Sequence, residues 1–135
     1  MALRLEAIDT NLILRAILND IPEQTEKVYK LLSTPSCIFY VPDQAITEAA
    51  FVLKNPDYGL PRENIVLALR EFLRTPRLDY NKSLFHKVFE TYLAHPKLSF
   101  NDCYLACHVA EREKTPLWTF DKALARQTTE SQLLD

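Results

Sequence analysis

The chain has 135 residues, 47% hydrophobic and 25% charged, a composition close to that of one ordinary globular domain. Its single glycine, Gly59, excludes enzymes that hold nucleotides in either of the two common glycine-rich phosphate-binding motifs. The net charge of −2 excludes a strongly basic nucleic-acid coat protein, and no apolar run approaches the ~18 residues of a membrane span.

Short apolar stretches alternate with helical patterns along the chain. Strands are predicted at 3–8, 37–41, 78–80 and 117–120, and 78–80 is expected at a sheet edge. Helices are predicted at 11–18, 23–32, 43–53, 61–73, 83–93, 101–113 and from Lys122, with Asp43 capping the third. The alternation predicts an α/β fold with a parallel sheet. The polar tail from Thr128 to Asp135 is expected to fray, and Trp118 to lie in the core.

Three acids fall where open α/β sheets place their ligand sites. Asp9 and Asp121 directly follow the first and last predicted strands, and the carboxyl ends of parallel strands share one edge of the sheet. Asp102 lies in the first turn of a predicted helix, on the same face as Leu105 and Ala106. Since helix N-termini lie at that same edge in a parallel fold, the three carboxylates are expected to meet.

Glu48 is the fourth acid of this group. It lies in a helix that is apolar nearly all round, so we expect it to be buried, and a buried unpaired charge costs several kcal/mol. Convergence of all four carboxylates on a divalent cation satisfies each of them. Oxygen ligands suit Mg²⁺ or Mn²⁺, which activate water for phosphodiester hydrolysis.

Each acid also has a purely structural interpretation. Asp102 fits a capping box with Ser99, and Asp9 or Asp121 alone fits a turn or an N-cap. Glu48 could instead pair with a buried arginine. The joint placement of four acids at one edge favours the metal site over these separate explanations.

The acidic segments together resemble the motifs of PIN-domain proteins, above all the VapC-type ribonuclease toxins of bacterial toxin–antitoxin pairs. The opening motif is Ile8–Arg15 with Asn19–Gln24, and the second is Ile46–Glu48. The third is Asn101–Ala106 and the fourth is Thr119–Leu124, where a phenylalanine is common at position 124. The motifs occur in family-like order and spacing over nearly the whole chain.

This resemblance implies a three-layer α/β/α fold around a central parallel sheet, as one PIN-like nuclease domain over residues 1–135. A helical pair, 61–94, would be inserted between the second and third acidic motifs. The resemblance further implies a Mg²⁺- or Mn²⁺-dependent endoribonuclease that acts on RNA, forms a homodimer and is neutralised by an antitoxin protein. It assigns the metal and catalytic roles to Asp9, Glu48, Asp102 and Asp121, with Thr10, Asn11 and Thr119 as supporting polar groups.

Arg15, the cysteines and the N-terminus lead to three further expectations. Arg15 is expected near the site, as a phosphate or antitoxin contact. Cys103, Cys107 and His108 lack the fourth ligand of a structural zinc site, so the cysteines are interpreted as core packing. Three cysteines, an odd number, and an N-terminus unlike a signal peptide favour the cytoplasm.

Two other functions compete with the ribonuclease. One is a non-catalytic PIN-like module that binds RNA or protein; the presence of all four acids argues against it. The other is a Mg²⁺-dependent phosphatase of the haloacid dehalogenase type, which needs Asp-x-Asp after the first strand. This chain has Asp9-Thr10-Asn11 there, so the second acid is missing.

Overall fold

A computed structural model describes residues 3–128 and 131–134, without the side chain at position 113. The chain divides into two compact units, Met1–Tyr80 and Asn81–Asp135, and each is described by itself. The boundary falls inside the predicted helical pair, between its two helices. In the part of the chain that the structure describes, no helix has the length and apolar character needed to cross a membrane.

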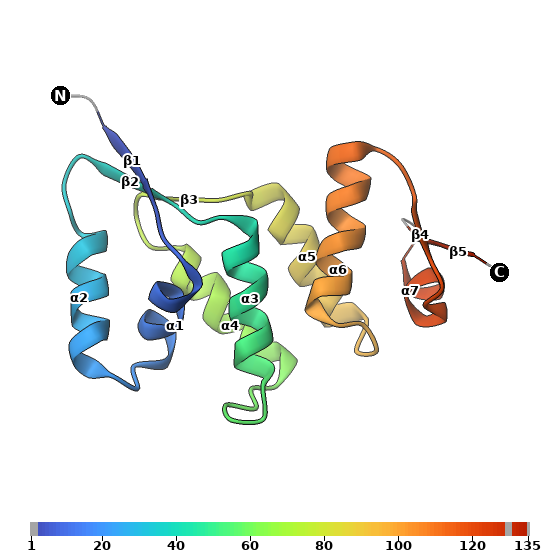
Figure 1. Ribbon diagram of the computed structural model, residues 1–135, viewed down its shortest axis with the longest axis horizontal. Helices are drawn as coiled ribbons and strands as arrows, with labels where there is room; N and C mark the ends of the chain where they lie inside the picture. Colours follow the sequence, from blue (N-terminus) through green and yellow to red (C-terminus); the bar gives the residue numbers. More distant parts are fainter. Residues whose placement is uncertain (1–2, 129–130, 135) are drawn as a thin grey trace. The chain divides into compact units, whose positions relative to one another are not determined.

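The first unit is built on a three-stranded parallel sheet of order β1-β2-β3. Arg4 pairs with Cys37 and Phe39 pairs with Leu78. In Figure 1 the four helices of this unit lie below the strands. The elements in chain order are β1 Arg4–Ala7, α1 Thr10–Leu18, α2 Pro22–Leu32, β2 Cys37–Tyr40, α3 Asp43–Lys54, α4 Arg62–Leu73 and β3 Leu78–Asp79.

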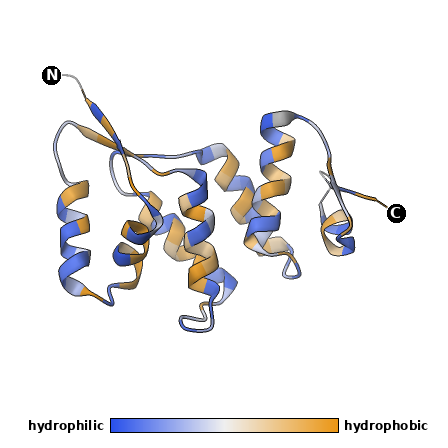
Figure 2. Ribbon diagram, in the orientation of Figure 1, coloured by the Kyte–Doolittle hydropathy of each residue, from blue (hydrophilic) through white to orange (hydrophobic). Residues whose placement is uncertain are grey.

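The central strand β2 carries the core of this unit. Cys37 and Phe39 of β2 are buried, as is Val41 directly after it. The strand predicted at 3–8 forms as β1, but all four of its residues are exposed. Hydrophobic residues of the helices complete the core, and Figure 2 shows the helices with hydrophobic and hydrophilic sides. The largest fully buried aliphatic side chains of these helices are Ile13, Ile46, Leu53, Ile65 and Leu69.

Local signals in the sequence fix where these helices begin. Pro22 is the first residue of α2, where its missing N–H costs no hydrogen bond. The prediction that Asp43 caps α3 is wrong: Pro42 is the N-cap, and Asp43 is the first helical residue. An acid there still interacts favourably with the positive end of the helix dipole.

The second unit pairs two long helices and adds a small sheet. Its elements are α5 Lys82–Ala94, α6 Phe100–His108, the π-helix η1 Val109–Glu113, β4 Leu117–Thr119, α7 Lys122–Gln127 and β5 Ser131–Leu133. Helix α5 packs on α6 through aromatic contacts, among them an edge-on pair of Tyr92 and Phe100 with ring centroids 5.2 Å apart. The helix predicted at 101–113 is α-helical only to His108, and it continues as a π-helical turn over Val109–Glu113.

Two expectations about the end of the chain are wrong. Ser131–Leu133 does not fray but forms β5, parallel to β4, although residues 129, 130 and 135 of the tail lie outside the described part. The buried Thr128 hydroxyl lies 2.8 Å from Ser131 Oγ and 3.0 Å from the carbonyl oxygen of Leu124, so it links the end of α7 to the start of β5. Trp118 is 59% exposed instead of buried, because β4 is a short strand of which no residue is buried.

Candidate functional site

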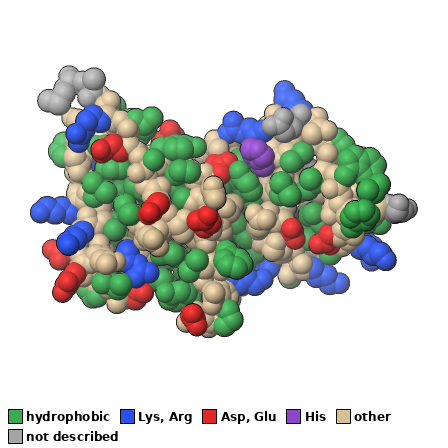
Figure 3. All heavy atoms as spheres, viewed as in Figure 1, with side chains coloured by type: hydrophobic (Ala, Val, Ile, Leu, Met, Phe, Trp, Pro, Cys, Tyr) green, Lys and Arg blue, Asp and Glu red, His purple; other side chains and the backbone are tan. Residues whose placement is uncertain are grey.

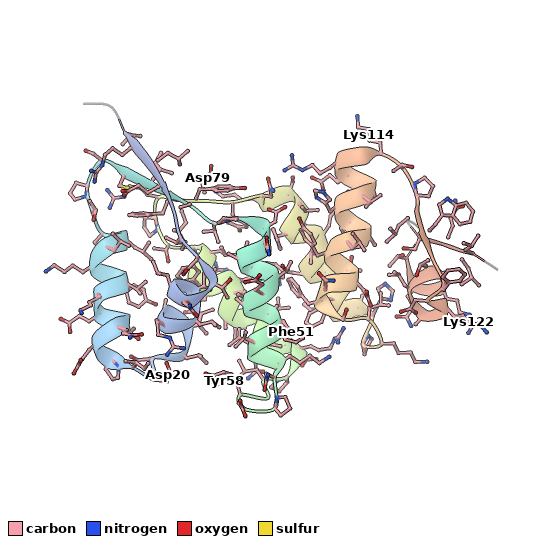
Figure 4. The ribbon with its side chains drawn as sticks, in the orientation of Figure 1. Asp20, Phe51, Tyr58, Asp79, Lys114 and Lys122 are labelled. Carbon is pink, nitrogen blue, oxygen red and sulfur yellow. The ribbon has the colours of Figure 1, made fainter. Side chains whose placement is uncertain are left out.

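Four of the residues that the sequence singles out line one hollow in the first unit. The hollow has a volume of about 420 Å³ and lies between the start of α1 and the middle of α3. It holds two carboxylates, a hydroxyl and an amide beside three apolar side chains, and Phe51 of α3 is labelled in Figure 4. Its lining residues are Asp9, Thr10, Asn11, Leu14, Glu48, Phe51 and Val52.

Asp9 lies between β1, which ends at Ala7, and α1, which begins at Thr10. It is exposed, and it follows the buried Ile8. Its Oδ1 accepts a hydrogen bond from the backbone N–H of Leu12 at 3.1 Å, so Asp9 is the N-cap of α1. The capping interpretation is therefore correct. It leaves the ligand role possible, because the cap bond uses only one of the two carboxylate oxygens.

The prediction that Glu48 is buried is wrong, since its side chain is exposed. Helix α3 buries one face only, and three of the five buried residues on it are alanines, so the helix looks more uniformly apolar in sequence than it is in space. Glu48 makes no ion pair in the described part of the chain, so the alternative of a buried arginine partner is wrong as well. The buried residues are Ala45, Ile46, Ala49, Ala50 and Leu53.

Two neutral side chains hold the Glu48 carboxylate. The Thr10 hydroxyl donates to Oε2 at 2.9 Å, and the Gln44 side-chain amide donates to Oε1 at 3.0 Å. Thr10 thereby links α1 to α3 at the hollow. Gln44 was missed by sequence reasoning, although its position four residues before Glu48 on one helix is the signal that could have found it.

The electrostatics of the hollow favour a cation. Within the described residues, neither Asp9 nor Glu48 has a lysine, arginine or histidine partner, so two carboxylates share the hollow without a counter-charge. Mg²⁺ is commonly bound through one or two carboxylates while it keeps several waters, and this donor set fits it. No described group of three or more His, Cys, Asp or Glu residues is gathered closely enough to hold a metal ion.

The other two acids begin helices in the second unit. Asp102 is half-buried in the first turn of α6, and its backbone N–H donates to Ser99 Oγ at 3.1 Å, so the predicted cap by Ser99 is confirmed. Asp121 is the N-cap of α7, and its Oδ1 accepts from the N–H of Leu124 at 3.1 Å. The convergence of all four carboxylates stays a prediction.

Thr119 supports Asp121 directly. Its Oγ1 accepts the backbone N–H of Asp121 at 2.9 Å, which fixes the turn from β4 into α7 and the orientation of the Asp121 backbone. This contact gives Thr119 a definite positioning role within the motif Thr119-Phe120-Asp121.

Arg15 lines a different hollow from the carboxylates. Its Nη1 lies 3.1 Å from Asp20 Oδ1 in an ion pair. With Lys27 and apolar residues of α1 and α2 it lines a second hollow of about 310 Å³. The two hollows share Asn11 of α1. Arg15 lies on the same helix, but it lines only the second hollow.

The three cysteines are buried and none of them forms a disulfide, in agreement with their interpretation as core residues. The acidity of Cys37 is altered by its surroundings. Its hydrogen bond to Glu6 Oε2 at 3.0 Å, together with burial, raises the pKa of the thiol above its ordinary value. Its thiol is therefore a poor nucleophile at neutral pH.

Comparison with known families gives one match. The family model of the PIN domain matches residues 7–129, a range that spans both units and includes all four predicted acids. The match agrees with the predicted α/β/α class, in which helices alternate with strands paired in parallel. No curated protein is significantly similar to the chain.

Proposed function

Because the chain belongs to the PIN domain family, whose members are generally metal-dependent nucleases, we propose that it is a Mg²⁺- or Mn²⁺-dependent endoribonuclease. We further propose that it serves as the toxin of a type II toxin–antitoxin pair in the cytoplasm. The observation that carries the proposal is the hollow in which Asp9 and Glu48 lie without a counter-charge. A metal-binding nuclease site explains why two carboxylates are kept at one place.

The proposal gives each side chain a role. Asp9 and Glu48 are the proposed metal ligands at the hollow, and Asp102 and Asp121 are the further acids that the resemblance assigns to the ligand set. Thr10 and Gln44 hold the Glu48 carboxylate in one orientation, as the bonds at 2.9 Å and 3.0 Å allow. Thr119 orients the backbone of Asp121 through its 2.9 Å bond, and Asn11 supplies an amide to the substrate side of the hollow.

When bound, the metal activates water and stabilises the negative charge that develops on the phosphodiester. The protein contributes fixed oxygen donors on helix starts. Because Asp9 and Asp121 are held by their cap bonds, they lose little side-chain freedom on binding.

The proposed partners follow from the resemblance to VapC-type toxins. They are an RNA substrate, a cognate antitoxin and a second copy of the chain in a homodimer. Arg15 is proposed to contact a phosphate or the antitoxin. Such a contact has to compete with the carboxylate of Asp20, which now lies 3.1 Å from the guanidinium.

The test is RNA cleavage by the purified chain with Mg²⁺ or Mn²⁺. We expect cleavage that EDTA stops and that Asp9→Asn abolishes, since asparagine keeps the cap oxygen but loses the ligand charge. Asp57→Asn is the matched control: it removes an exposed carboxylate from a turn outside the hollow, and it should leave cleavage intact. Expression of the wild type, and not of Asp9→Asn, should slow growth.

Two results would contradict the proposal. If no RNA is cut with either ion, catalysis is absent and the chain is a binding module. If Asp9→Asn cuts RNA as fast as Asp57→Asn, the nuclease centre does not depend on the acid hollow.

A further inference from the structure

A second hollow of the first unit is lined by residues of α1 and α2 and adjoins the hollow of Asp9 and Glu48, which we call the acid hollow. The second hollow has a volume of about 310 Å³, at the lower end of the range for small-molecule sites. We call it the basic hollow, because two of the described residues that line it are cations and none is an acid. Its lining residues are Asn11, Leu12, Arg15, Gln24, Lys27, Val28 and Leu31.

The lining takes the basic and apolar residues of α2 and leaves out its acids. Glu23 and Glu26 lie on the same helix as Lys27 but do not line the hollow. Figure 3 shows basic and acidic side chains mixed at the left of the view, where α2 lies in Figure 1. The excess of positive charge is therefore a property of the basic hollow and not of the surface around it.

Most hydrogen-bond donors of the two cations are unused. Both contacts of the Arg15 guanidinium run from Nη1 to Asp20, at 3.1 Å to Oδ1 and 3.3 Å to Oδ2, and the Arg15 side chain is only 18% exposed. Within the described residues, Nη2 and Nε of Arg15 and the ammonium of Lys27 have no partner. Asp20, labelled in Figure 4, lies in the loop between α1 and α2. The free edge of the guanidinium can therefore bind a phosphate while Nη1 keeps Asp20.

The two hollows adjoin along α1. Asn11 lines both, and Arg15 follows it by four residues on one face of the helix. An RNA strand carries one negative charge per nucleotide, and a metal in the acid hollow would offset only the charge at the cleaved phosphodiester. We propose that the basic hollow binds the neighbouring nucleotide, with its phosphate on Arg15 and Lys27 and its base against the apolar side chains. This inference rests on the proposed ribonuclease function and adds how the substrate is held.

The chemistry of the lining and its position favour a nucleotide over a protein partner. Leu12, Val28 and Leu31 form an apolar wall, and apolar side chains can cover a base that has left its stack. Asn11 and Gln24 add side-chain amides that make no hydrogen bond within the described residues and that can pair with the edge of a base. The substrate strand has to continue beside the acid hollow, and the neighbour that shares Asn11 with it carries the cations.

The anisotropy of a fluorescently labelled, single-stranded oligouridylate in EDTA measures binding without cleavage. Lys27→Gln should weaken binding about threefold and reduce the slope of log K against log salt by about 0.7, because one phosphate contact is lost. Lys30→Gln is the matched control: it removes the same charge from an exposed position of α2 outside the lining, and it should change neither quantity. An oligomer with the same phosphates but abasic sugars should bind the wild type about threefold more weakly, since the apolar wall loses its base.

Asp20 provides a change in the opposite direction. Asp20→Asn removes the carboxylate that holds Nη1, so the whole guanidinium is available and RNA should bind about threefold more tightly. Glu23→Gln removes an exposed carboxylate at the start of α2, outside the lining, and controls for overall charge. Arg15→Gln should weaken binding about tenfold, and the KM for RNA in Mn²⁺ should rise by a similar factor. Circular dichroism of each variant shows whether it is folded.

Three results would overturn the inference. The first is equal RNA affinity of Lys27→Gln and Lys30→Gln, which would leave the basic hollow to a protein partner. The second is equal binding of the abasic oligomer, and the third is weaker binding by Asp20→Asn than by Glu23→Gln. Binding that depends on Arg15 and Lys27 without cleavage in Mn²⁺ would refute the nuclease and leave the basic hollow standing. Cleavage by variants that keep wild-type RNA affinity would refute the basic hollow alone.

Discussion

Asp9 has two roles that asparagine and alanine should separate. Its Oδ1 caps α1 by accepting the Leu12 N–H at 3.1 Å, and asparagine offers an equivalent oxygen. Asp9→Ala removes the cap and should lower the free energy of unfolding by about 1 kcal/mol. Asp9→Asn should lower it by only about 0.5 kcal/mol, through the weaker interaction with the helix dipole.

The metal role should show itself only when the metal is added. At a Mn²⁺ concentration a hundredfold above Kd, binding to the folded chain stabilises it by about 2.7 kcal/mol. For a chain of this size, about 1 kcal/mol shifts Tm by roughly 4 °C, so the wild type should gain about 10 °C. Both Asp9 variants should gain little, although they start from different stabilities.

Thermal and urea unfolding, followed by circular dichroism with and without Mn²⁺, measure both effects. Asp57→Asn serves as the control that loses one carboxylate outside the hollow. A full Mn²⁺ shift in Asp9→Asn would show that the Asp9 charge does not bind the metal. Equal destabilisation by asparagine and alanine would refute the capping argument.

Three further perturbations test single contacts. Thr10→Val removes the hydroxyl that donates to Glu48 at 2.9 Å, so Mn²⁺ affinity in calorimetric titration should fall about tenfold; an unchanged affinity would show that this bond does not orient the ligand. Ser99→Ala removes the oxygen that caps α6 at 3.1 Å, so the free energy of unfolding in urea should fall by about 1 kcal/mol while RNA cleavage persists; lost cleavage in a folded variant would give Ser99 a role in the site. The Glu6 hydrogen bond and burial raise the pKa of Cys37 above 9.0, so the folded chain holds this proton more tightly than the unfolded chain does. Stability present below pH 9.0 is therefore lost as pH rises through the higher folded pKa, and Cys37→Ala should flatten that alkaline fall in urea titrations; an identical pH profile would exclude the thiol.

Much of the fold could be predicted because its signals are local. Pro22 starts α2 and Ser99 caps α6 through contacts that span three residues or fewer, so the sequence alone contains both partners. The strands at 37–41 and 78–80 were predictable from short apolar runs, and their parallel pairing from the helices between them. Asp9 and Glu48 could be assigned to one site for the same reason: each follows a predicted strand or lies on the helix after it.

Two of the errors concern burial, which depends on residues far away in the chain. Glu48 has apolar neighbours in sequence, but the turn of the helix separates its exposed face from the alanines. Trp118 belongs to an apolar run that resembles an inner strand, yet β4 is only three residues long and pairs with β5. Whether an apolar side chain is covered depends on what packs over it, and hydropathy patterns carry no information about that partner.

Parallel pairing makes the folding of Met1–Tyr80 depend on closure of long chain segments. Arg4 meets Cys37 and Phe39 meets Leu78, so each pairing joins residues about 35 positions apart and cannot gain contacts until that interval has closed. Each interval contains two helices, which form in about a microsecond or less, well before strands can register. We therefore expect strand registration to set the folding rate. During synthesis on the ribosome, the sheet stays incomplete until Leu78 and Asp79 have emerged, long after the acids of the hollow have been made.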